Sequence, residues 1–503
     1  MDKTNDFSQF RRQSKKGIIV IYLNLIYKFL KAFWILLFLF IQKFSKITQE
    51  TLLYIYLGVA VLLIFLLVRA YLIFKNFKFK VENKHFVLQK GIIKKTNTSI
   101  PFDRIQNINF KQNIIQQIIN VHEVNVETAG SSKAEISIKA LSFKDAKDLK
   151  NIVTVVSDKE SLKVEQVEKE QDKPLLKIGF LSLLKVSLTE NHLQSLLLLF
   201  ALLVGFFQQV DDLFKGLGKK EELSNFISNN ASALKTSVFL IVGLLVFLSI
   251  VAVLSSIVRV VFKHFNLTVF IKNDALEVYQ GLTTKKSVIL KKSKIQHITI
   301  STNPIKRKLG ISFITFKQAI SGKVNKKQKD KIIRIVGCKE KQVTEVKSLL
   351  SFNKELQDIS FQNSNIYLKY RNYIRSLFFF IPLNVLFFFE IEEYNAFWIN
   401  LIIIPIYLVA VHFFYKKRIF KFSKDVLLIG TGILETHKTY LPFFKVQNIK
   451  MKQTIFQERK NVADLVFQTA SGKVKLPCVD FDKALHIYNY TLFKVESSTK
   501  SWM

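Results

Sequence analysis

The sequence predicts a multi-span α-helical membrane protein, with about six transmembrane helices in three pairs and three β-rich domains that each end in a closing helix. Three observations predict this class. Hydrophobic residues make up 49% of the 503 residues, yet the formal net charge is +37. Apolar stretches of about bilayer length recur in pairs, each followed by a segment of alternating apolar and polar residues. One short motif also occurs three times, and internal repeats indicate repeated structural units.

The repeated motif is a glycine followed fifteen residues later by a glutamine, which comes after a basic and an aliphatic residue. Its glycine, basic residue and glutamine are Gly91, Arg104 and Gln106 in the first copy, Gly281, Lys294 and Gln296 in the second, and Gly432, Lys445 and Gln447 in the third. A polar residue between aliphatic ones, on a strand beside a turn, is usually buried and hydrogen-bonded. Because every copy needs such a fold determinant, we interpret the motif as structural, with ligand contact as the alternative.

The first apolar pair covers residues 18–41 and 52–74. In the first stretch Asn24, Lys28 and Lys31 share one helical stripe, so residues 18–31 either span the bilayer or lie at its interface as an amphipathic helix. The second stretch has about the twenty apolar residues that a bilayer requires. The arginines and lysines of residues 10–16 indicate a cytoplasmic flank, because no small-residue cleavage site follows them.

Each β unit combines alternating strands, turns at glycine or asparagine, and a final helix. Residues 77–81 and 134–139 alternate with a period of two, and residues 143–156 carry an apolar stripe at helical spacing. The predicted organisation is 1–74 for the N-terminal flank and first helix pair, 75–156 for the first domain, 157–180 for a linker, 181–263 for the second pair, 264–350 for the second domain, 351–372 for a linker, 373–416 for the third pair and 417–495 for the third domain.

The distribution of charge predicts which way the chain faces. Two predicted spans separate each β unit from the next, so all three units face one compartment. The short loops on the opposite side carry few basic residues, and the domain side holds most of the positive excess. Basic residues beside spans stay cytoplasmic. We therefore expect both termini and all three domains to lie in the cytoplasm.

The segment that surrounds the glutamine is distinctive in sequence. Residues 100–108 read IPFDRIQNI, which is similar to the pattern I-P-x-x-(R/K)-I-Q-x-(V/I). The third copy keeps Leu441-Pro442, whereas the middle copy has a proline only in its next segment, at Pro304. With the paired spans, these residues resemble the bacterial pleckstrin-homology-like membrane proteins of the YdbS/YdbT type, of which the chain is identified as a three-copy member. The resemblance covers essentially the whole chain.

The resemblance implies the fold and the setting of the protein. It implies that the three β units are pleckstrin-homology-like domains, and that the chain is a multi-pass protein of the bacterial inner membrane. It also implies a role in envelope stress or in resistance to antimicrobial compounds.

The sequence lacks the motifs of catalysis, nucleotide binding and metal ligation. It contains no phosphate-binding loop, no GxGxxG, no HExxH and no GxSxG, and no two of its eight histidines stand at metal-ligand spacing. Cys338 and Cys478 lie outside any CxxC motif, so we expect reduced, packed thiols. His297 takes the repeat position of Asn107 and Asn448, which indicates a turn or edge role. We therefore expect no enzyme activity and no cofactor.

Basic clusters in the middle domain are the candidate contact site. Residues 263–350 carry 20 Lys and Arg against 5 Asp and Glu. The predicted contacts with lipid or a partner are Lys285, Lys286, Lys291, Lys292, Lys294, Lys306, Arg307 and Lys308. A solvated basic surface is the alternative. Contact with the anionic inner leaflet would contribute about 1 kcal/mol per basic residue. Because the domain is tethered to the membrane and has no nucleic-acid motif, we expect no nucleic acid as a partner.

These features predict a non-enzymatic scaffold whose cytoplasmic domains bind inner-leaflet lipid or protein partners, including a membrane-protein partner or a second copy of the chain. The alternative is an accessory component of an export or resistance transport system, in which the spans form a substrate path. Such a path needs polar residues in the spans. The polar residues there are Asn24, Asn384, Asn400 and His412.

Overall fold

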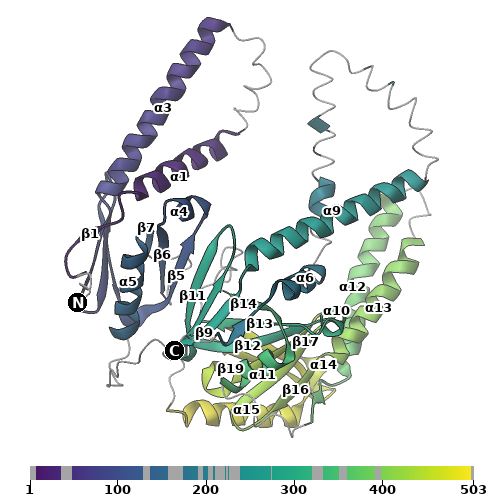
Figure 1. The fold of residues 1–503 in the computed structure, drawn as a ribbon. Helices are drawn as coiled ribbons and strands as arrows, with labels where there is room; N and C mark the ends of the chain where they lie inside the picture. Colours follow the sequence, from purple (N-terminus) through teal and green to yellow (C-terminus); the bar gives the residue numbers. More distant parts are fainter. Residues whose placement is uncertain are drawn as a thin grey trace.

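One order of elements occurs three times along the chain (Figure 1). The computed structural model describes residues 7–34, 48–128, 136–156, 174–190, 196–201, 205, 208–209, 221, 225, 238–272, 275–319, 332–349, 360–390 and 398–499. Within them, each repeat has a short strand, two helices, three strands, a 3-10 turn, a strand, a short helix, two strands and a closing helix. The sequence repeat is therefore a structural repeat.

The elements of the three repeats correspond one to one. The first repeat consists of β1 (Arg11–Arg12), α1 (Gly17–Ala32), α3 (Gln49–Lys75), β2 (Lys78–Glu82), β3 (His85–Lys90), β4 (Thr96–Pro101), η2 (Phe102–Arg104), β5 (Ile105–Gln112), α4 (Ile114–Ile118), β6 (His122–Thr128), β7 (Ile136–Leu141) and α5 (Phe143–Val156). The second consists of β8 (Leu176–Lys177), α6 (Phe180–Leu188), α9 (Val238–His264), β9 (Thr268–Lys272), β10 (Ala275–Gln280), β11 (Lys285–Lys291), η3 (Lys292–Lys294), β12 (Ile295–Thr302), α10 (Pro304–Lys308), β13 (Ser312–Gln318), β14 (Ile333–Cys338) and α11 (Glu340–Leu349). The third consists of β15 (Gln362–Asn363), α12 (Tyr367–Glu390), α13 (Trp398–Lys416), β16 (Ile419–Phe422), β17 (Val426–Gly432), β18 (Thr436–Pro442), η6 (Phe443–Lys445), β19 (Val446–Lys452), α14 (Ile455–Glu458), β20 (Val462–Thr469), β21 (Gly472–Asp480) and α15 (Phe481–Glu496).

The sheets continue from one domain into the next. Their strand orders are β1-β2-β3-β4, β7-β6-β5-β11-β10-β9-β8, β14-β13-β12-β18-β17-β16-β15 and β19-β20-β21. Strand β5 of the first domain pairs with β11 of the second, and β12 of the second pairs with β18 of the third, both antiparallel. We call these pairings the first seam and the second seam. The three domains thus form one β assembly, in which β4 and β19 are the strands equivalent to the seam strands that have no partner in another domain within the described residues.

The hydrophobic cores differ at the two seams. The first domain has its own cluster of buried residues, which includes Phe86 and Leu149. The cluster of the second domain extends into the third, where it includes Leu428 and Tyr440. The second and third domains therefore share buried apolar residues, whereas the first domain meets the second mainly through strand pairing. A middle domain cut out of this assembly would expose both of its paired strands.

The motif glycines stand where no other residue fits. Gly91, Gly281 and Gly432 have positive φ angles of 121°, 105° and 131°. A Cβ atom on them would lie 2.0, 2.1 and 1.8 Å from the carbonyl oxygen of the residue three positions later. Both the backbone angle and this close approach require glycine. The structural interpretation of the motif glycine therefore has a direct physical basis.

The motif glutamine marks a β-bulge in every copy. The ladder registers shift between Ile105 and Asn107, between the equivalent residues of β12, and between those of β19, so the glutamine is the extra residue each time. Its environment is not uniform, because Gln296 is fully buried while Gln447 is exposed. The expectation of a buried hydrogen-bonding residue in every copy is therefore wrong for Gln447. The shared role of the glutamine position is the bulge.

The helices form pairs, but two of them meet the length and hydropathy expected of a membrane span. Within the described residues these are Gln49–Lys75 and Val246–His264, with a shorter apolar helical segment at Ile403–Lys416. The predicted count of six spans is therefore not confirmed. Helix α1 has only 16 residues, and α12 contains a proline and a polar first turn. Residues 35–41 and most of 193–207, which also belong to predicted spans, lie outside the described residues.

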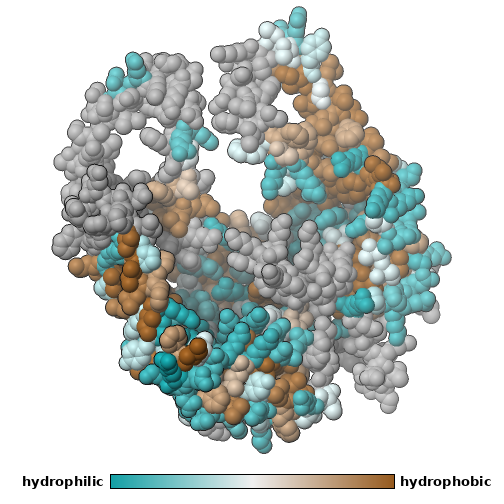
Figure 2. Space-filling view, turned by 180° about the vertical axis from the view of Figure 1, so that it is seen from behind, coloured by the Kyte–Doolittle hydropathy of each residue, from teal (hydrophilic) through white to brown (hydrophobic). Residues whose placement is uncertain are grey.

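Hydrophobic surface gathers on the helices. Figure 2 shows it over an arm above the domains, whereas hydrophilic residues dominate the β assembly below. Large exposed apolar side chains are frequent along α3, for example Leu57 at 55% and Phe65 at 59% exposure. A soluble protein rarely exposes such a continuous apolar surface. This surface agrees with a helix that lies in a bilayer.

Candidate functional site: a basic cavity at the first seam

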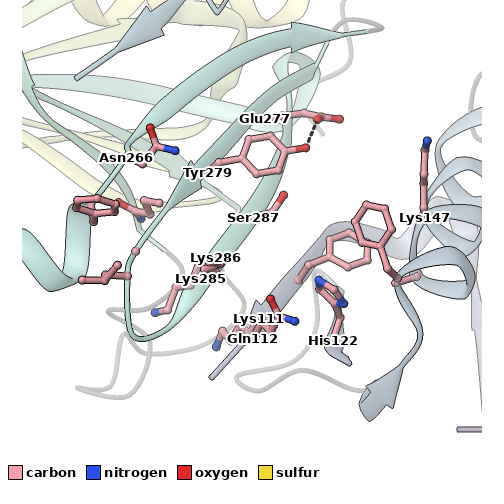
Figure 3. A pocket seen from close by; sticks show the side chains of 17 residues that line it. Lys111, Gln112, His122, Lys147, Asn266, Glu277, Tyr279, Lys285, Lys286 and Ser287 are labelled. Carbon is pink, nitrogen blue, oxygen red and sulfur yellow. Dashed lines mark hydrogen bonds between the residues drawn. The ribbon is translucent and has the colours of Figure 1, made fainter. Parts of the chain in front are cut away.

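A cavity of about 670 Å³ lies at the first seam (Figure 3). Strands β5 and β6 and helix α5 of the first domain form one wall, and β10, β11 and the turn between them form the other. Its charged side chains are Lys111, Lys147, Glu277, Lys285 and Lys286. Four cations against one carboxylate give the cavity a positive potential, which favours an anionic ligand.

Two of these lysines face each other across the seam. In the antiparallel register Lys286 of β11 lies directly opposite Lys111 of β5, and both line the cavity. Like charges directly opposite each other on adjacent strands are destabilising. An anion held between the two ammonium groups would convert this repulsion into two attractive contacts.

The wall of the second domain holds its carboxylate in a hydrogen bond. The Tyr279 hydroxyl donates to Glu277 Oε2 over 2.8 Å (Figure 3). Burial and the neighbouring Glu277 carboxylate raise the pKa of Tyr279 to about 12, so the phenol stays protonated near neutral pH. The Glu277 side chain is only 5% exposed. The carboxylate is therefore held in the wall by the phenol.

The wall of the first domain contributes a neutral imidazole. Burial, and secondarily Lys285, lower the pKa of His122, so its ring is uncharged near neutral pH. The ring lies 5.5 Å from that of Phe143, and both line the cavity. Its Nδ1 atom is buried and makes no hydrogen bond within the described residues. A ligand in the cavity could satisfy this nitrogen.

The cavity lies beside the end of a candidate membrane span. Phe265 and Asn266 follow α9 directly and line the cavity. The backbone N–H of Leu282, in the turn between β10 and β11, donates to the Phe262 carbonyl over 2.9 Å. The turn is therefore fixed to the last residues of α9. A span that ends there brings the cavity to the membrane surface.

The structure separates the eight predicted contact residues. Lys285 and Lys286 line the cavity. Lys291, Lys292 and Lys294 lie at the far end of the seven-residue β11 and in η3, roughly 20 Å away along an extended strand. Arg307 and Lys308 are exposed on α10. The eight residues therefore do not form a single surface.

Lys306 is a correction to the predicted contact set. Its side chain is 3% exposed and forms an ion pair with Glu435 of the third domain. Its Nζ atom also lies 3.7 Å from the centre of the Phe313 ring. Burial depresses the pKa of Lys306, and the bond to Glu435 opposes that effect. Lys306 thus joins two domains across the second seam, and it is not available to a membrane surface.

The basic residue of the motif also differs between the copies. Lys445 is 3% exposed, and its Nζ donates to the Ser293 carbonyl of the second domain over 2.6 Å. Burial and the nearby Lys294 lower the pKa of Lys445 to about 8. Arg104, at the same motif position, is exposed. The motif cation therefore joins domains in the third copy, which supports its structural interpretation there.

Sequence reasoning missed the half of the site that lies in the first domain. Lys111, His122 and Lys147 were not predicted contacts, because the basic clusters that stand out in the sequence all lie in the middle domain. The residue types of the repeat do not single them out. Lys111 lies twenty residues after Gly91, where the third copy also has a lysine, Lys452, and the second has Ser301. The pairing of Lys111 with Lys286 across domains is what distinguishes it, and that pairing is not readable in the sequence.

Comparison with known proteins agrees with this repeated architecture. The family model described as bacterial PH domain matches residues 27–154, 232–352 and 377–492, which together exceed half of the chain. The chain is 23% identical over 413 residues to UPF0699 transmembrane protein YdbT of Bacillus subtilis (strain 168), which covers 80% of this chain and 81% of the relative. No solved structure matches the chain. The three family matches confirm the predicted resemblance and its three copies.

Proposed function

The chain belongs to the bacterial PH domain family, and from this premise we propose that it is a membrane scaffold whose first seam binds an anionic lipid headgroup. In this proposal the chain is a multi-pass protein of the bacterial inner membrane, with three pairs of membrane-associated helices. Its termini and its three domains lie in the cytoplasm, and it binds lipid without catalysing a reaction.

The observation that carries the proposal is the lysine pair at the floor of the cavity. In the second seam the residues equivalent to Lys111 and Lys286 are Ser301 and His437, whose Oγ and Nδ1 atoms lie 2.7 Å apart in a hydrogen bond. The same place in the fold thus holds a serine–histidine hydrogen bond in one seam and two cations in the other. Two cations at one place favour an anion between them.

A lipid is favoured over a soluble anion by position and by lining. The cavity borders the end of α9, and its wall includes the aromatic rings of Phe110, Phe143 and Phe265. These apolar rings offer a surface that the acyl end of a lipid can cover, which a soluble anion cannot. The protein is tethered to the bilayer, so even a weak headgroup site experiences a high effective lipid concentration.

The transport alternative depended on polar residues in the helices. Asn384 of α12 and Asn400 of α13 form hydrogen bonds with each other across their helix pair. Such a pair stabilises helix association in an apolar environment. Because the Asn384–Asn400 pair is explained by helix association, it does not support a substrate path. The scaffold therefore remains the proposed function.

Thermal unfolding of the full-length protein in a neutral detergent tests the proposal. Dioctanoyl phosphatidylglycerol should raise the Tm more than dioctanoyl phosphatidylcholine does at the same concentration. The double variant Lys111→Met, Lys286→Met should lose most of this difference. Each lysine contributes about 1 kcal/mol to headgroup binding, so the variant should bind phosphatidylglycerol roughly ten- to thirtyfold more weakly. Without lipid, the same variant should have a higher Tm than the wild type, because the repulsion is removed.

The charge-matched control is Lys339→Met, Lys341→Met, at two exposed positions at the start of α11. This variant should keep the response to phosphatidylglycerol. Glycerol 3-phosphate, added at the same concentration, shows whether a soluble phosphate ester raises the Tm as much as the lipid does. Equal Tm shifts with both lipids, or an unchanged response in the Lys111→Met, Lys286→Met variant, would contradict the proposal.

A further inference from the structure

We infer that copies of this chain join edge to edge, with β19 of one copy adding to β4 of the next copy. This inference goes beyond lipid binding, because it assigns an interaction surface and its occupant. It rests on the two open ends of the β assembly and on the two internal seams, which show how such an end is closed. The occupant of each open end is the opposite end of a second copy.

Both ends of the assembly are open within the described residues. Strand β4 pairs with β3, and β19 pairs with β20, and neither has a second partner strand there. Gln447 and Asn448 of β19 are exposed, whereas the equivalent Gln296 and His297 of β12 are 0% and 3% exposed in the second seam. An open strand edge offers backbone N–H and C=O groups to another chain.

The two internal seams use one common register. In the first seam Val288 lies opposite Asn109. In the second seam Thr439 lies opposite Thr299. Val288 and Thr439 each lie seven residues after the glycine of their own repeat, and both partners lie eighteen residues after theirs. The fold thus has a single rule for joining consecutive domains, although the side chains at the two seams differ.

The same rule gives the register of the open ends. Seven residues after Gly91 is Thr98 of β4, and eighteen residues after Gly432 is Lys450 of β19. Thr98 of one copy should therefore lie directly opposite Lys450 of the next. Each residue belongs to a strand that already has the conformation used in the seams.

The segments that flank the two ends are also complementary. In the first seam Gln117 of the short helix α4 donates to the carbonyls of Leu282 and Thr283, over 3.2 and 3.0 Å, so that the helix covers the hairpin turn. At the open ends the corresponding turn and helix expose apolar side chains. Their exposed fractions are 100% for Ile93 of the turn and 69% each for Ile455 and Phe456 of α14. The equivalent Leu434 and Ile114 keep 75% and 55% exposure in the formed seams, so joining the ends would bring these apolar groups together without burying them fully.

Lysines on an edge strand often prevent such pairing, and β19 carries Lys450 and Lys452. The first seam shows that this fold tolerates them, because Lys286 lies opposite Lys111 in a formed pairing. At the open ends, Thr98 and Thr96 would face the two lysines, so no like charges meet. A head-to-tail contact of this kind leaves two free ends on a dimer, and it therefore builds rings or chains.

Disulfide crosslinking between two co-expressed full-length copies tests the inference. One tagged copy carries Thr98→Cys, and a copy with a different tag carries Lys450→Cys. Residues directly opposite on paired strands have Cβ atoms roughly 4.5–5.5 Å apart, within reach of a disulfide after a small adjustment. Mild oxidation of native membranes should give a disulfide-linked species with both tags. The native Cys338 and Cys478 are buried, so wild-type copies should give none.

The matched control replaces Lys450→Cys by Met451→Cys, whose side chain points to the other face of the strand. It should crosslink at least fivefold less. Equal crosslinking of the two pairs would indicate random collision and would overturn the inference, as would no crosslinking of either pair. A single chain that carries both Thr98→Cys and Lys450→Cys provides a further test. If its two cysteines form a disulfide with each other, β19 pairs with β4 of the same chain, and the second copy is ruled out as the occupant. If either single variant instead forms a disulfide with another protein, that protein occupies the open edge, and the inference of a second copy is refuted.

Discussion

The first and second seams share a strand register but differ in what lies between the domains. The second seam is held by side-chain bonds, among them Thr299 to Thr439 at 3.1 Å and Ser301 to His437 at 2.7 Å. The first seam has Asn109 and Val288 at the positions of the threonine pair. It has two lysines at the positions of the serine–histidine pair. The backbone thus sets the joint, and the side chains decide what lines it, because a cavity of about 590 Å³ that borders Thr299, Ser301 and His437 lies at the second seam as well.

The difference teaches how a repeat protein can obtain a binding site without a new fold. At the second seam, shared core residues and an interdomain ion pair make two domains into one block. Cavities with an excess of cations lie at both seams, and in the cavity of the first seam Lys111 lies directly opposite Lys286. The seam with the opposed lysines is therefore the better candidate for anion binding.

The largest expected effect is at the ion pair of the second seam. Glu435→Ala should lower the free energy of unfolding by about 3 kcal/mol, because it leaves the buried Lys306 without its partner. Thr284, which takes the same repeat position in the first seam, should tolerate alanine within about 0.5 kcal/mol. Thermal unfolding of the two full-length variants measures the contrast. The double variant Lys306→Met, Glu435→Ala should recover most of the loss, and a failure to recover would contradict a desolvation cost.

The second-largest expected effect is a loss of stability of the second seam at acidic pH. Burial lowers the pKa of His297 to about 3, and its Nδ1 lies 3.1 Å from Ser471 Oγ. Because the folded pKa is below the unfolded value, the unfolded chain binds more protons between these two values, and stability is lost as the pH falls below about 6.5. From pH 7 to pH 5 the loss from this histidine is about 2 kcal/mol. His297→Asn, which inserts the residue of the other two copies, should reduce the pH dependence of Tm; an unchanged slope would exclude His297 as its source.

Exchanging the side chains of the seams should have a smaller effect. Lys111→Ser with Lys286→His gives the first seam the residues of the second, and it should raise stability by up to about 1 kcal/mol while abolishing the response to phosphatidylglycerol. The reverse exchange, Ser301→Lys with His437→Lys, should lower stability by a similar amount. Thermal unfolding with and without lipid measures both changes. If the first exchange kept the lipid response, the lysine pair would not be the anion site.

The smallest expected effect concerns the threonine pair. Thr439→Val inserts the residue that the first seam carries at this position and removes one hydrogen bond. It should lower the free energy of unfolding by about 0.5–1 kcal/mol. The double variant Thr299→Val, Thr439→Val should lie closer to the wild type, since no hydroxyl then remains unpaired. A double variant that is less stable than Thr439→Val would instead point to poor packing of the methyl groups.

Local patterns predicted the elements of each repeat but not the relations between repeats. The alternating segments and the helical stripe of residues 143–156 were readable, and α5 spans Phe143–Val156 in the structure. The short helix that follows β5, β12 and β19 was not predicted in any copy, although Pro304 marks its first turn in the middle copy. In the other two copies Asn113 with Gln116, and Thr454 with Gln457, form capping boxes that serve the same purpose. A side-chain cap is harder to recognise in a sequence than a proline.

The candidate site could be predicted only in part for a related reason. Lys285 and Lys286 stood out because the middle domain is strongly basic, and both line the cavity. Lys111 and His122 belong to a less basic domain, and they meet the other residues only through strand pairing between domains. Composition cannot distinguish the exposed Lys308 from the buried Lys306, which lie two positions apart. Their difference depends on Glu435, more than a hundred residues away.

The sequence by itself determined the number of repeats, the elements within each, and the place of the glycine that every hairpin requires. These features depend on local backbone geometry and on the alternation of apolar residues, which act over a few neighbouring positions. Only the tertiary structure decided that the domains share sheets, that two lysines meet in one seam where a serine meets a histidine in the other, and that β4 and β19 have no second partner strand within the described residues. These features depend on pairing between strands that are distant in the chain, and the free energy of such pairing is not encoded in either strand alone.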